Sequence, residues 1–194
     1  MTATKPTTKV MTPKFRVSFP DVFVARAMEQ GQEPKFAITM LFAKDADLTA
    51  LKAAAQQAVI DKWGADPKKW PANLKSPFRD QGDMEYEGYE KGCIFVRATS
   101  KQKPGVVGLD AKTPLEPADF YPGCYARATV NAFAYETKGN KGVSFGLQNV
   151  QKLEDGDPLG GRSRPDQDFE PVAAPLGGAP GTPGPATSAD ALFG

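Results

Sequence analysis

The sequence predicts a mainly β protein with one helix, long loops and a disordered acidic tail. Three observations support this fold class. Five segments concentrate or alternate apolar residues over strand length, only one segment has helical periodicity, and the residues from Glu154 onward are rich in Pro and Gly. The chain has 194 residues, of which 40% are hydrophobic. This composition is typical of one folded domain with a core of its own.

The first elements are an arm and two strands. Residues 1–13 are rich in Thr and Lys and are expected to form a flexible N-terminal arm. Residues 14–19 alternate with period two, which predicts a strand with Phe15, Val17 and Phe19 on one face. Residues 35–42 predict a second strand, and Pro20 and Gly31 interrupt the chain between the two.

Residues 48–63 have the only clear helical pattern. Asp45 or Asp47 supplies an N-cap, and Gly64 follows as a C-terminal stop. The apolar stripe is narrow and rich in Ala, so we interpret the helix as a scaffold lying against a small barrel or sheet. The residues of this stripe are Leu48, Leu51, Ala55, Val59 and Trp63.

Three more strands are predicted at residues 93–99, 125–136 and 142–153, and residues 137–142 have the composition of a hairpin turn. Residues 14–153 then form one domain with five strands, one helix and long loops. A five-stranded Greek-key barrel of the oligonucleotide/oligosaccharide-binding (OB) type fits this arrangement. Another β-barrel or a β-sandwich would have the same strand count.

Several classes of chemistry are unsupported by the composition. The chain has no His and two Cys, Cys93 and Cys124, which lie in strand-like segments and are expected to be reduced, packed thiols. No phosphate-binding glycine motif is present, so we expect a non-enzymatic protein without a metal or cofactor. An acidic metal nuclease remains an alternative, although its residues more closely match a solvated loop: Asp83, Glu85, Glu87 and Glu90.

Charge is divided between the body and the tail. The residues before Glu154 include 22 basic and 16 acidic ones, a net charge of +6, whereas residues 154–194 include 2 and 7, a net charge of −5. This division suggests a polyanion site on the body and a tail that competes for it, and a role in solubility is the alternative for the tail. The tail ends in a hydrophobic tip, expected to dock a protein partner, with Asp190, Leu192 and Phe193. No apolar run is long enough to span a bilayer and no signal peptide is evident, so we expect a cytoplasmic protein without a membrane partner.

The strand at residues 125–136 carries the clearest functional pattern. Small apolar residues alternate with Tyr125, Arg127, Phe133 and Tyr135, which predicts a crowded interior on one side and exposed aromatic and cationic side chains on the other. The competing interpretation places the larger side chains in the core. Exposed aromatic rings stack on bases and cations contact phosphates, so the pattern predicts a single-stranded nucleic-acid site. Its candidate residues are Lys35, Arg79, Tyr86, Tyr89, Lys91, Arg97, Lys101, Lys103, Tyr125, Arg127, Phe133, Tyr135, Lys138 and Lys141. A protein-interaction module is the rival function, because Tyr and Arg are also typical of protein hot spots.

Two stretches resemble a known family. They are Phe120-Tyr121-Pro122-Gly123-Cys124-Tyr125-Ala126-Arg127-Ala128 and the strand at 142–153 that continues into Glu154-Asp155-Gly156-Asp157-Pro158-Leu159-Gly160-Gly161. They resemble phage-encoded single-stranded DNA-binding proteins, a family long catalogued as a domain of unknown function, over residues 14–161. The resemblance implies an OB fold and sequence-nonspecific coating and protection of single-stranded DNA in phage replication and recombination, in the cytoplasm of a bacterial host.

The tail is similar to the C-terminal tails with which single-strand binders dock replication or recombination proteins. It departs from them in two ways. Phe193 is the penultimate residue rather than the last, and Asp190 is the only acid near the tip.

Overall fold

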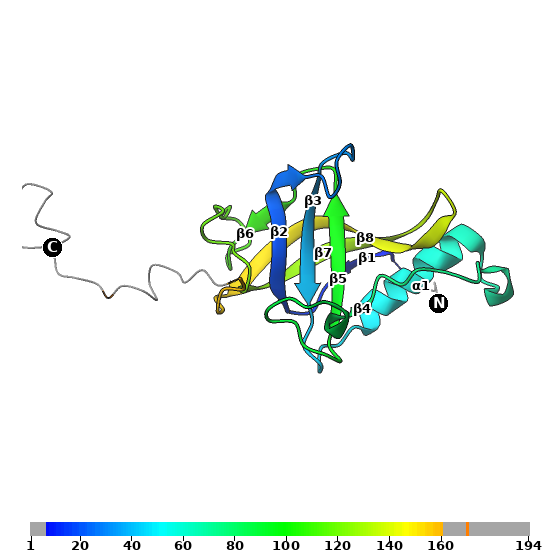
Figure 1. Ribbon diagram of the computed structural model, residues 1–194, viewed down its shortest axis with the longest axis horizontal. Coiled ribbons are helices and arrows are strands. Elements are labelled where there is room, and N and C mark those ends of the chain that lie inside the picture. Colours follow the sequence, from blue (N-terminus) through cyan, green and yellow to red (C-terminus); the bar gives the residue numbers. More distant parts are fainter. Residues whose placement is uncertain (1–6, 161–169, 171–194) are drawn as a thin grey trace, which may run out of the picture. The chain divides into compact units, whose positions relative to one another are not determined.

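Five long strands close a barrel in the computed structural model, which describes residues 7–160 and Glu170. Strand β2 pairs with β3, β3 with β5, β5 in parallel with β8, β8 with β7, and β7 again with β2. This closed order is that of an OB-type Greek-key barrel, so the predicted fold class is confirmed. Figure 1 shows β2, β3 and β5 side by side, crossing over β7 and β8. The strands are β2 (Phe15–Arg26), β3 (Lys35–Leu41), β5 (Ile94–Ser100), β7 (Tyr125–Thr137) and β8 (Asn140–Glu154).

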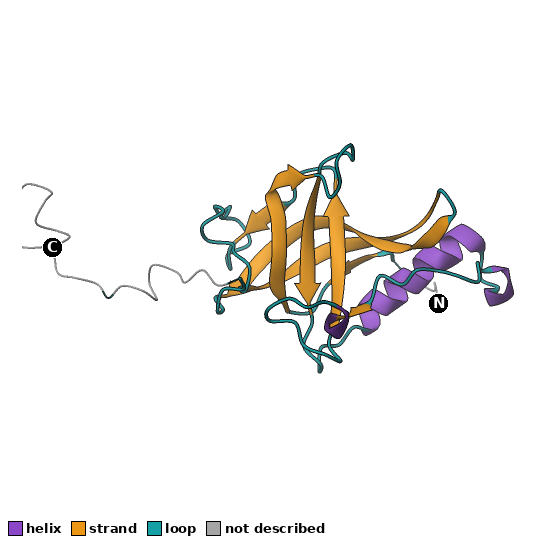
Figure 2. Ribbon diagram, in the orientation of Figure 1, coloured by secondary structure: helices purple, strands orange, loops and turns teal. Residues whose placement is uncertain are grey.

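Three short strands extend the sheet beyond the five that the sequence predicts (Figure 2). They are β1 (Lys9–Met11), β4 (Arg79–Asp80) and β6 (Gly105–Val107), which pair with β7, β5 and β8 respectively. Strands of two or three residues are too short to show a period of two, which is why the sequence pattern does not reveal them. The long connection after the helix also contains two 3₁₀ turns, η1 (Pro67–Lys69) and η2 (Gln81–Asp83).

Strand β1 lies within the stretch expected to be a flexible arm. Its residues pair with Asn131 to Thr129 of β7. Thr12 is buried, and its Oγ1 accepts a hydrogen bond from the backbone N–H of Ala128. The expectation of a flexible arm is therefore wrong for residues 9–12, because β7 offers them a free edge, while residues 1–6 lie outside the described part of the chain.

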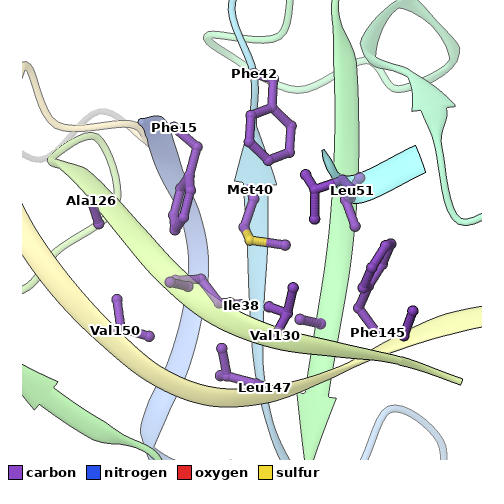
Figure 3. Close-up of a cluster of buried hydrophobic side chains, with 14 of the residues drawn as sticks. Phe15, Ile38, Met40, Phe42, Leu51, Ala126, Val130, Phe145, Leu147 and Val150 are labelled. Atoms are coloured by element: carbon purple, nitrogen blue, oxygen red, sulfur yellow. The ribbon is translucent and has the colours of Figure 1, made fainter. Parts of the chain in front are cut away.

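The barrel interior is filled as the alternation of β7 predicts. Ala126, Ala128, Val130 and Ala132 are buried, so the competing interpretation with these residues outward is wrong. Their small side chains leave room for larger ones from the other strands. Figure 3 shows this cluster of buried side chains, which includes Ile38, Met40, Phe145 and Leu147. Cys93 and Cys124 are buried free thiols, as predicted.

The helix α1 (Thr49–Trp63) packs mainly against β7. The N-cap is Leu48, not Asp45 or Asp47 as predicted, although the carboxylate of Asp47 accepts a hydrogen bond from the backbone N–H of Thr49 at 2.9 Å. Gly64 ends the helix with a φ of 90°, a conformation that favours glycine. The buried side of α1 is rich in Ala, which lets the helix approach the barrel closely, as expected of a scaffold. Its buried residues include Leu51, Ala54, Ala55, Ala58 and Val59.

Strand β2 changes course at Phe19. The pairing of β2 with β3 is irregular beyond Ser18, and Phe19 has a φ of 44°, in the left-handed region. Phe15 and Val17 are buried, but Phe19 is 45% exposed. The prediction that the three share one face is therefore wrong, because the irregularity turns Phe19 outward.

The folded body continues past the predicted domain boundary at residue 153. Residues 155–160, here called the strap, lie against the body. The hydroxyl of Tyr121 donates to Asp155 Oδ1 at 2.8 Å, and the backbone N–H of Leu159 donates to Pro122 O at 3.0 Å. Gly123 has a φ of 109°, and a Cβ there would lie 2.1 Å from the carbonyl oxygen of Asp157. The tail prediction is thus wrong for the strap, and the predicted tip with Asp190, Leu192 and Phe193 lies outside the described residues.

Candidate nucleic-acid interface

The outer side of β2, β3 and β5 carries the densest group of aromatic and cationic side chains that the sequence singles out. Ile38, Met40, Val96 and Ala98 fill the core, so their neighbours along the strands point outward. Cross-strand pairing places Thr39 opposite Arg97 and Leu41 opposite Phe95. We call this surface the β3–β5 face. It comprises Phe19, Thr39, Phe95, Arg97 and Thr99, with Tyr86 and Tyr89 from the loop before β5.

Four aromatic rings form a continuous series on the β3–β5 face. The ring centroids of Phe19 and Tyr86 are 5.2 Å apart, those of Tyr86 and Tyr89 5.4 Å, and those of Tyr89 and Phe95 5.9 Å. All three pairs are edge-to-face, a favourable geometry for aromatic rings. Phe95 is only 6% exposed, whereas Tyr86 is 48% and Phe19 45% exposed. The buried rings therefore support two outer rings that are open to a ligand.

The loop that presents Tyr86 and Tyr89 is fastened at both ends. Asp80 Oδ1 accepts hydrogen bonds from the backbone N–H groups of Gly82 at 2.7 Å and Gly92 at 3.1 Å, and these bonds hold the pKa of the Asp80 carboxyl below its usual value. The buried side chain of Gln81 donates to Phe42 O and Ile94 O and accepts from the N–H of Glu90. The loop is thus held in one conformation over β5.

Tyr89 connects this loop to β2. Its hydroxyl donates a hydrogen bond to Ser18 Oγ at 3.1 Å. Burial raises the pKa of Tyr89, so the phenol stays neutral at physiological pH. Tyr89 acts here as a support for Tyr86.

Cationic groups flank the aromatic series. The Nε of Arg97 is buried and has no hydrogen-bond partner among the residues that the structure describes. Beside it lies a cleft of about 290 Å³, lined among others by Arg26, Lys35 and Arg97. The guanidinium of Arg79 lies 5.2 Å from the centroid of the Phe95 ring. An anionic chain could therefore meet cations on both sides of the exposed rings.

The rim of the cleft holds an ion pair. Lys101 Nζ lies 2.7 Å from Glu33 Oε2, and the hydrogen bond from Lys101 lowers the pKa of Glu33. Both groups are well exposed, so the pair is an exchangeable surface contact.

The structure divides the sequence-predicted residues into groups. The β3–β5 face and its cleft bring together Lys35, Arg79, Tyr86, Tyr89, Arg97 and Lys101. Lys91 lies in the fastened loop, and Lys103 follows β5; both are exposed. Tyr125 and Arg127 lie on β7, which does not pair with β5: β8 lies between the two strands on one side of the barrel, and β2 and β3 lie between them on the other. Arg97 and Arg127 line different hollows of the described surface, so the expectation that Arg97 extends the face of Arg127 is wrong.

Tyr125 and Arg127 have other neighbours. Lys14 Nζ lies 5.3 Å from the centroid of the Tyr125 ring. Arg127 Nε donates a hydrogen bond to Gln151 Oε1 at 2.9 Å.

Four further candidates lie at the end of the β7–β8 hairpin, which extends beside α1 in Figure 1. Phe133 is 41% exposed, and Lys141 forms an ion pair with Glu136 at 2.8 Å. Lys138 and Gly139 form the two-residue turn, both with positive φ, as the predicted hairpin requires. The group is Phe133, Tyr135, Lys138 and Lys141.

Sequence reasoning missed Phe19 as a site residue. The alternation of residues 14–19 grouped it with Phe15 and Val17 on one face, and the available signal was Pro20, since a proline within a strand marks a bulge or an edge.

Two other features bear on the alternatives. Within residues 7–160 and Glu170, no group of three or more His, Cys, Asp or Glu side chains is arranged to hold a metal ion. Over the same part of the chain, no helix has the length and apolar character needed to cross a membrane.

The chain matches a known protein family and a phage relative. The family described as "Enterobacter phage Enc34, ssDNA-binding protein" matches residues 8–176. Protein p50 of Acyrthosiphon pisum secondary endosymbiont phage 1 is 30% identical over 163 residues, which cover 79% of this chain and 87% of p50.

Solved structures share the fold. The single-stranded DNA-binding protein from bacteriophage Enc34 in complex with ssDNA matches with a TM-score of 0.66 and 22% identity, over 82% of this chain and 97% of that one. The single-stranded DNA-binding protein gp2.5 of bacteriophage T7 matches with a TM-score of 0.53 and 14% identity, over 86% and 98%. At these identities the two matches establish the fold.

Proposed function

This chain belongs to the family of the Enterobacter phage Enc34 ssDNA-binding protein, and we propose from that membership that it binds single-stranded DNA without sequence specificity. In this proposal it coats and protects DNA strands exposed during phage replication and recombination, in the cytoplasm of a bacterial host. The observation that carries the proposal is the β3–β5 face, where the exposed rings of Phe19 and Tyr86 lie on the same surface as the unpaired Nε of Arg97.

Each part of the β3–β5 face has a role in the proposed binding. Phe19 and Tyr86 stack on successive bases, at about 1–3 kcal/mol per base, without regard to base identity. Tyr89 and Phe95 hold those rings in place. Arg97 and Lys35 contact phosphates, so the logarithm of affinity should fall with the logarithm of salt by about 0.7 per phosphate contacted.

The remaining candidates extend the proposal. Lys91 and Lys103 would guide the strand along the edge of the face, and the residues of β7 and its hairpin would contact DNA that continues around the barrel. The protein performs no chemical step in this proposal. Replication or recombination proteins are proposed partners of the tail tip with Asp190, Leu192 and Phe193.

A titration of fluorescently labelled oligo-dT tests the proposed function. We expect saturable binding in moderate salt. The double variant Phe19→Ala/Tyr86→Ala should bind at least tenfold more weakly, since each stacked base contributes about 1–3 kcal/mol. Val24→Ala is the matched control, because it also removes an exposed apolar side chain from β2. A pure protein-interaction module would give no saturable binding of oligo-dT. If Val24→Ala weakened binding as much as the double variant, the rings of Phe19 and Tyr86 would have no specific role in binding.

A further inference from the structure

A second hollow surface lies on the outer side of β7 and β8, which faces away from the barrel core. Strands β1, β7, β8 and β6 lie side by side there, and their outward residues line a cavity of about 380 Å³. Cross-strand pairing sets Met11, Thr129, Asn149 and Gly105 in one row, and Arg127 pairs with Gln151 in the next. The small Thr129 and Gly105 make the row concave. We call this surface the β7–β8 trough.

The floor of the trough includes a glycine beside Asn149. A Cβ at Gly105 would lie 2.8 Å from Asn149 Oδ1, so a larger residue there would shift the Asn149 side chain. Asn149 Oδ1 accepts a hydrogen bond from the backbone N–H of Gly105 at 3.3 Å. Its NH₂ group has no partner among the described residues and is available to a ligand.

One wall of the trough is a tightly fixed loop at residues 108–113. Gln151 Nε2 donates to the carbonyl oxygens of Gly108 and Leu109, both at 3.1 Å. Asp110 Oδ1 accepts from the backbone N–H groups of Lys112 and Thr113. Ala111 lines the trough with a φ of 58°, a strained conformation for a residue with a Cβ. Strain of this kind is held in place at ligand sites more often than elsewhere.

Two further donors lack partners at this surface. Thr129 Oγ1 is buried and has no hydrogen-bond partner among the described residues, a costly arrangement unless a ligand completes it. The Nε of Arg127 is occupied by Gln151 Oε1, which fixes the guanidinium while no described residue bonds to its terminal nitrogens. The trough therefore presents oriented donors beside apolar side chains.

These features define the ligand chemistry. Two parallel N–H groups of an Arg match two acceptors on one edge of a planar base, as on guanine O6 and N7. Met11, Val107 and Ala111 supply apolar contacts for the faces of such a base. A cavity of this volume, largely apolar with a few fixed polar groups, is typical of sites for small planar ligands. A carboxylate would use Arg127 but would leave these apolar contacts unused.

We propose that the β7–β8 trough binds one purine base, guanine by preference, through Arg127, Thr129 and Asn149. This inference rests on the proposed function, because a DNA strand is the natural source of the base, and it adds a base-selective site to a surface that is otherwise sequence-tolerant. The base is supplied by a bound strand or by a free nucleotide. Both sources share the chemistry that the trough recognises.

Saturation-transfer difference NMR on the full chain with dGMP, dAMP and dTMP tests the trough. We expect a saturable dGMP signal and a weaker dTMP signal. Arg127→Ala should weaken dGMP binding about tenfold or more, the size of one bidentate base contact. Thr129→Val, which keeps the side-chain shape and removes the hydroxyl, should weaken it severalfold. Lys112→Ala is the matched control, because it removes an exposed cation from the loop beside the trough.

Parallel titrations identify the source and separate this proposal from the first. If a dG placed within oligo-dT raises the affinity of the natural chain but not that of Arg127→Ala, the base comes from a bound strand. If dGMP binds but the dG in the strand has no such effect, the ligand of the trough is a free nucleotide. No saturable dGMP signal, or one unchanged in Arg127→Ala, overturns the trough. The peptide Ala-Asp-Ala-Leu-Phe-Gly has the sequence of the tail tip. If it displaces dGMP and binds more tightly than dGMP does, the trough is a peptide site and the proposal of a base site is overturned. Plain oligo-dT affinity, measured alongside, tests the proposed single-strand binding and not the preference for guanine.

Discussion

Arg97 combines two properties that rarely occur together in a side chain with only a structural role. Its Nε is buried, and no described residue accepts its hydrogen bond. A charged donor left in this state destabilises the free protein unless an anion completes it. The neighbouring rings would position a nucleotide so that its phosphate meets this group. The unpaired Nε of Arg97 thus lowers the stability of the free protein, and a bound phosphate would satisfy the same group.

Substitution of Arg97 should change the salt dependence of DNA binding. We expect Arg97→Ala to weaken oligo-dT binding and to reduce the slope of log affinity against log salt by about 0.7, the value for one phosphate contact. Fluorescence titrations at four salt concentrations measure both quantities. Lys52→Ala, which removes an exposed cation from α1, is the control and should leave the slope unchanged. An unaltered slope in Arg97→Ala would show that Arg97 meets no phosphate.

Among the elements, the loop at residues 80–92 controls the position of Tyr86. We expect Asp80→Ala to remove both hydrogen bonds to Gly82 and Gly92, to speed hydrogen exchange in the loop and to weaken oligo-dT binding. Asp83→Ala, which changes an acidic residue of the same loop, is the control.

The same carboxylate predicts a pH dependence of the loop. Because the pKa of Asp80 is lowered in the folded state, its contribution to loop stability is present above the ordinary value of 3.8 and is lost as the pH falls through the lowered pKa. The protection factors of the loop amides, which correct for the intrinsic pH dependence of exchange, should therefore fall in acid in the natural chain but not in Asp80→Ala. A similar fall in both would contradict this role.

The strap is the second element with a specific expectation. Gly123→Ala should lower the free energy of unfolding by more than Gly31→Ala, although both glycines have positive φ. The added Cβ meets the carbonyl oxygen of Asp157 at Gly123, whereas nothing lies within 4 Å at Gly31. The difference, expected to exceed about 1 kcal/mol, isolates the packing of the strap. Chemical denaturation measures it, and equal losses would mean that the strap does not pack on Gly123 in solution.

The sequence predicts the long elements well and the local irregularities poorly. Period-two alternation and helical spacing locate four strands and α1 to within two residues, because burial on one side imposes those periods. The strand predicted at residues 14–19 continues to Arg26 in the structure, past the irregularity at Phe19. Strands β1, β4 and β6 owe their existence to partner edges, which no local pattern encodes. The outward turn of Phe19 follows from an irregular ladder, and the separation of Arg97 from Arg127 follows from barrel closure. Residue types of the site were therefore predictable, but their grouping required the tertiary structure.

In the molecule as a whole, the body and the tail carry net charges of opposite sign. Residues 162–194 contain two basic and four acidic residues. We expect their deletion to tighten oligo-dT binding, most at low salt, because it removes a net negative charge that competes with DNA. A full-length variant with Asp166, Asp168, Glu170 and Asp190 changed to Asn or Gln controls for chain length. Unchanged or weaker binding after deletion would show that the tail does not compete.

In the proposed function, the β3–β5 face binds unstacked bases, which only a single strand offers. The most direct test is a competition of full-length protein, bound to labelled oligo-dT, against unlabelled single strands and duplexes of matched length. We expect the single strand to displace the probe at concentrations at least tenfold lower than the duplex, and this preference should shrink in Phe19→Ala/Tyr86→Ala. Equal displacement by single strand and duplex would contradict the account, because it would reduce binding to phosphate attraction alone.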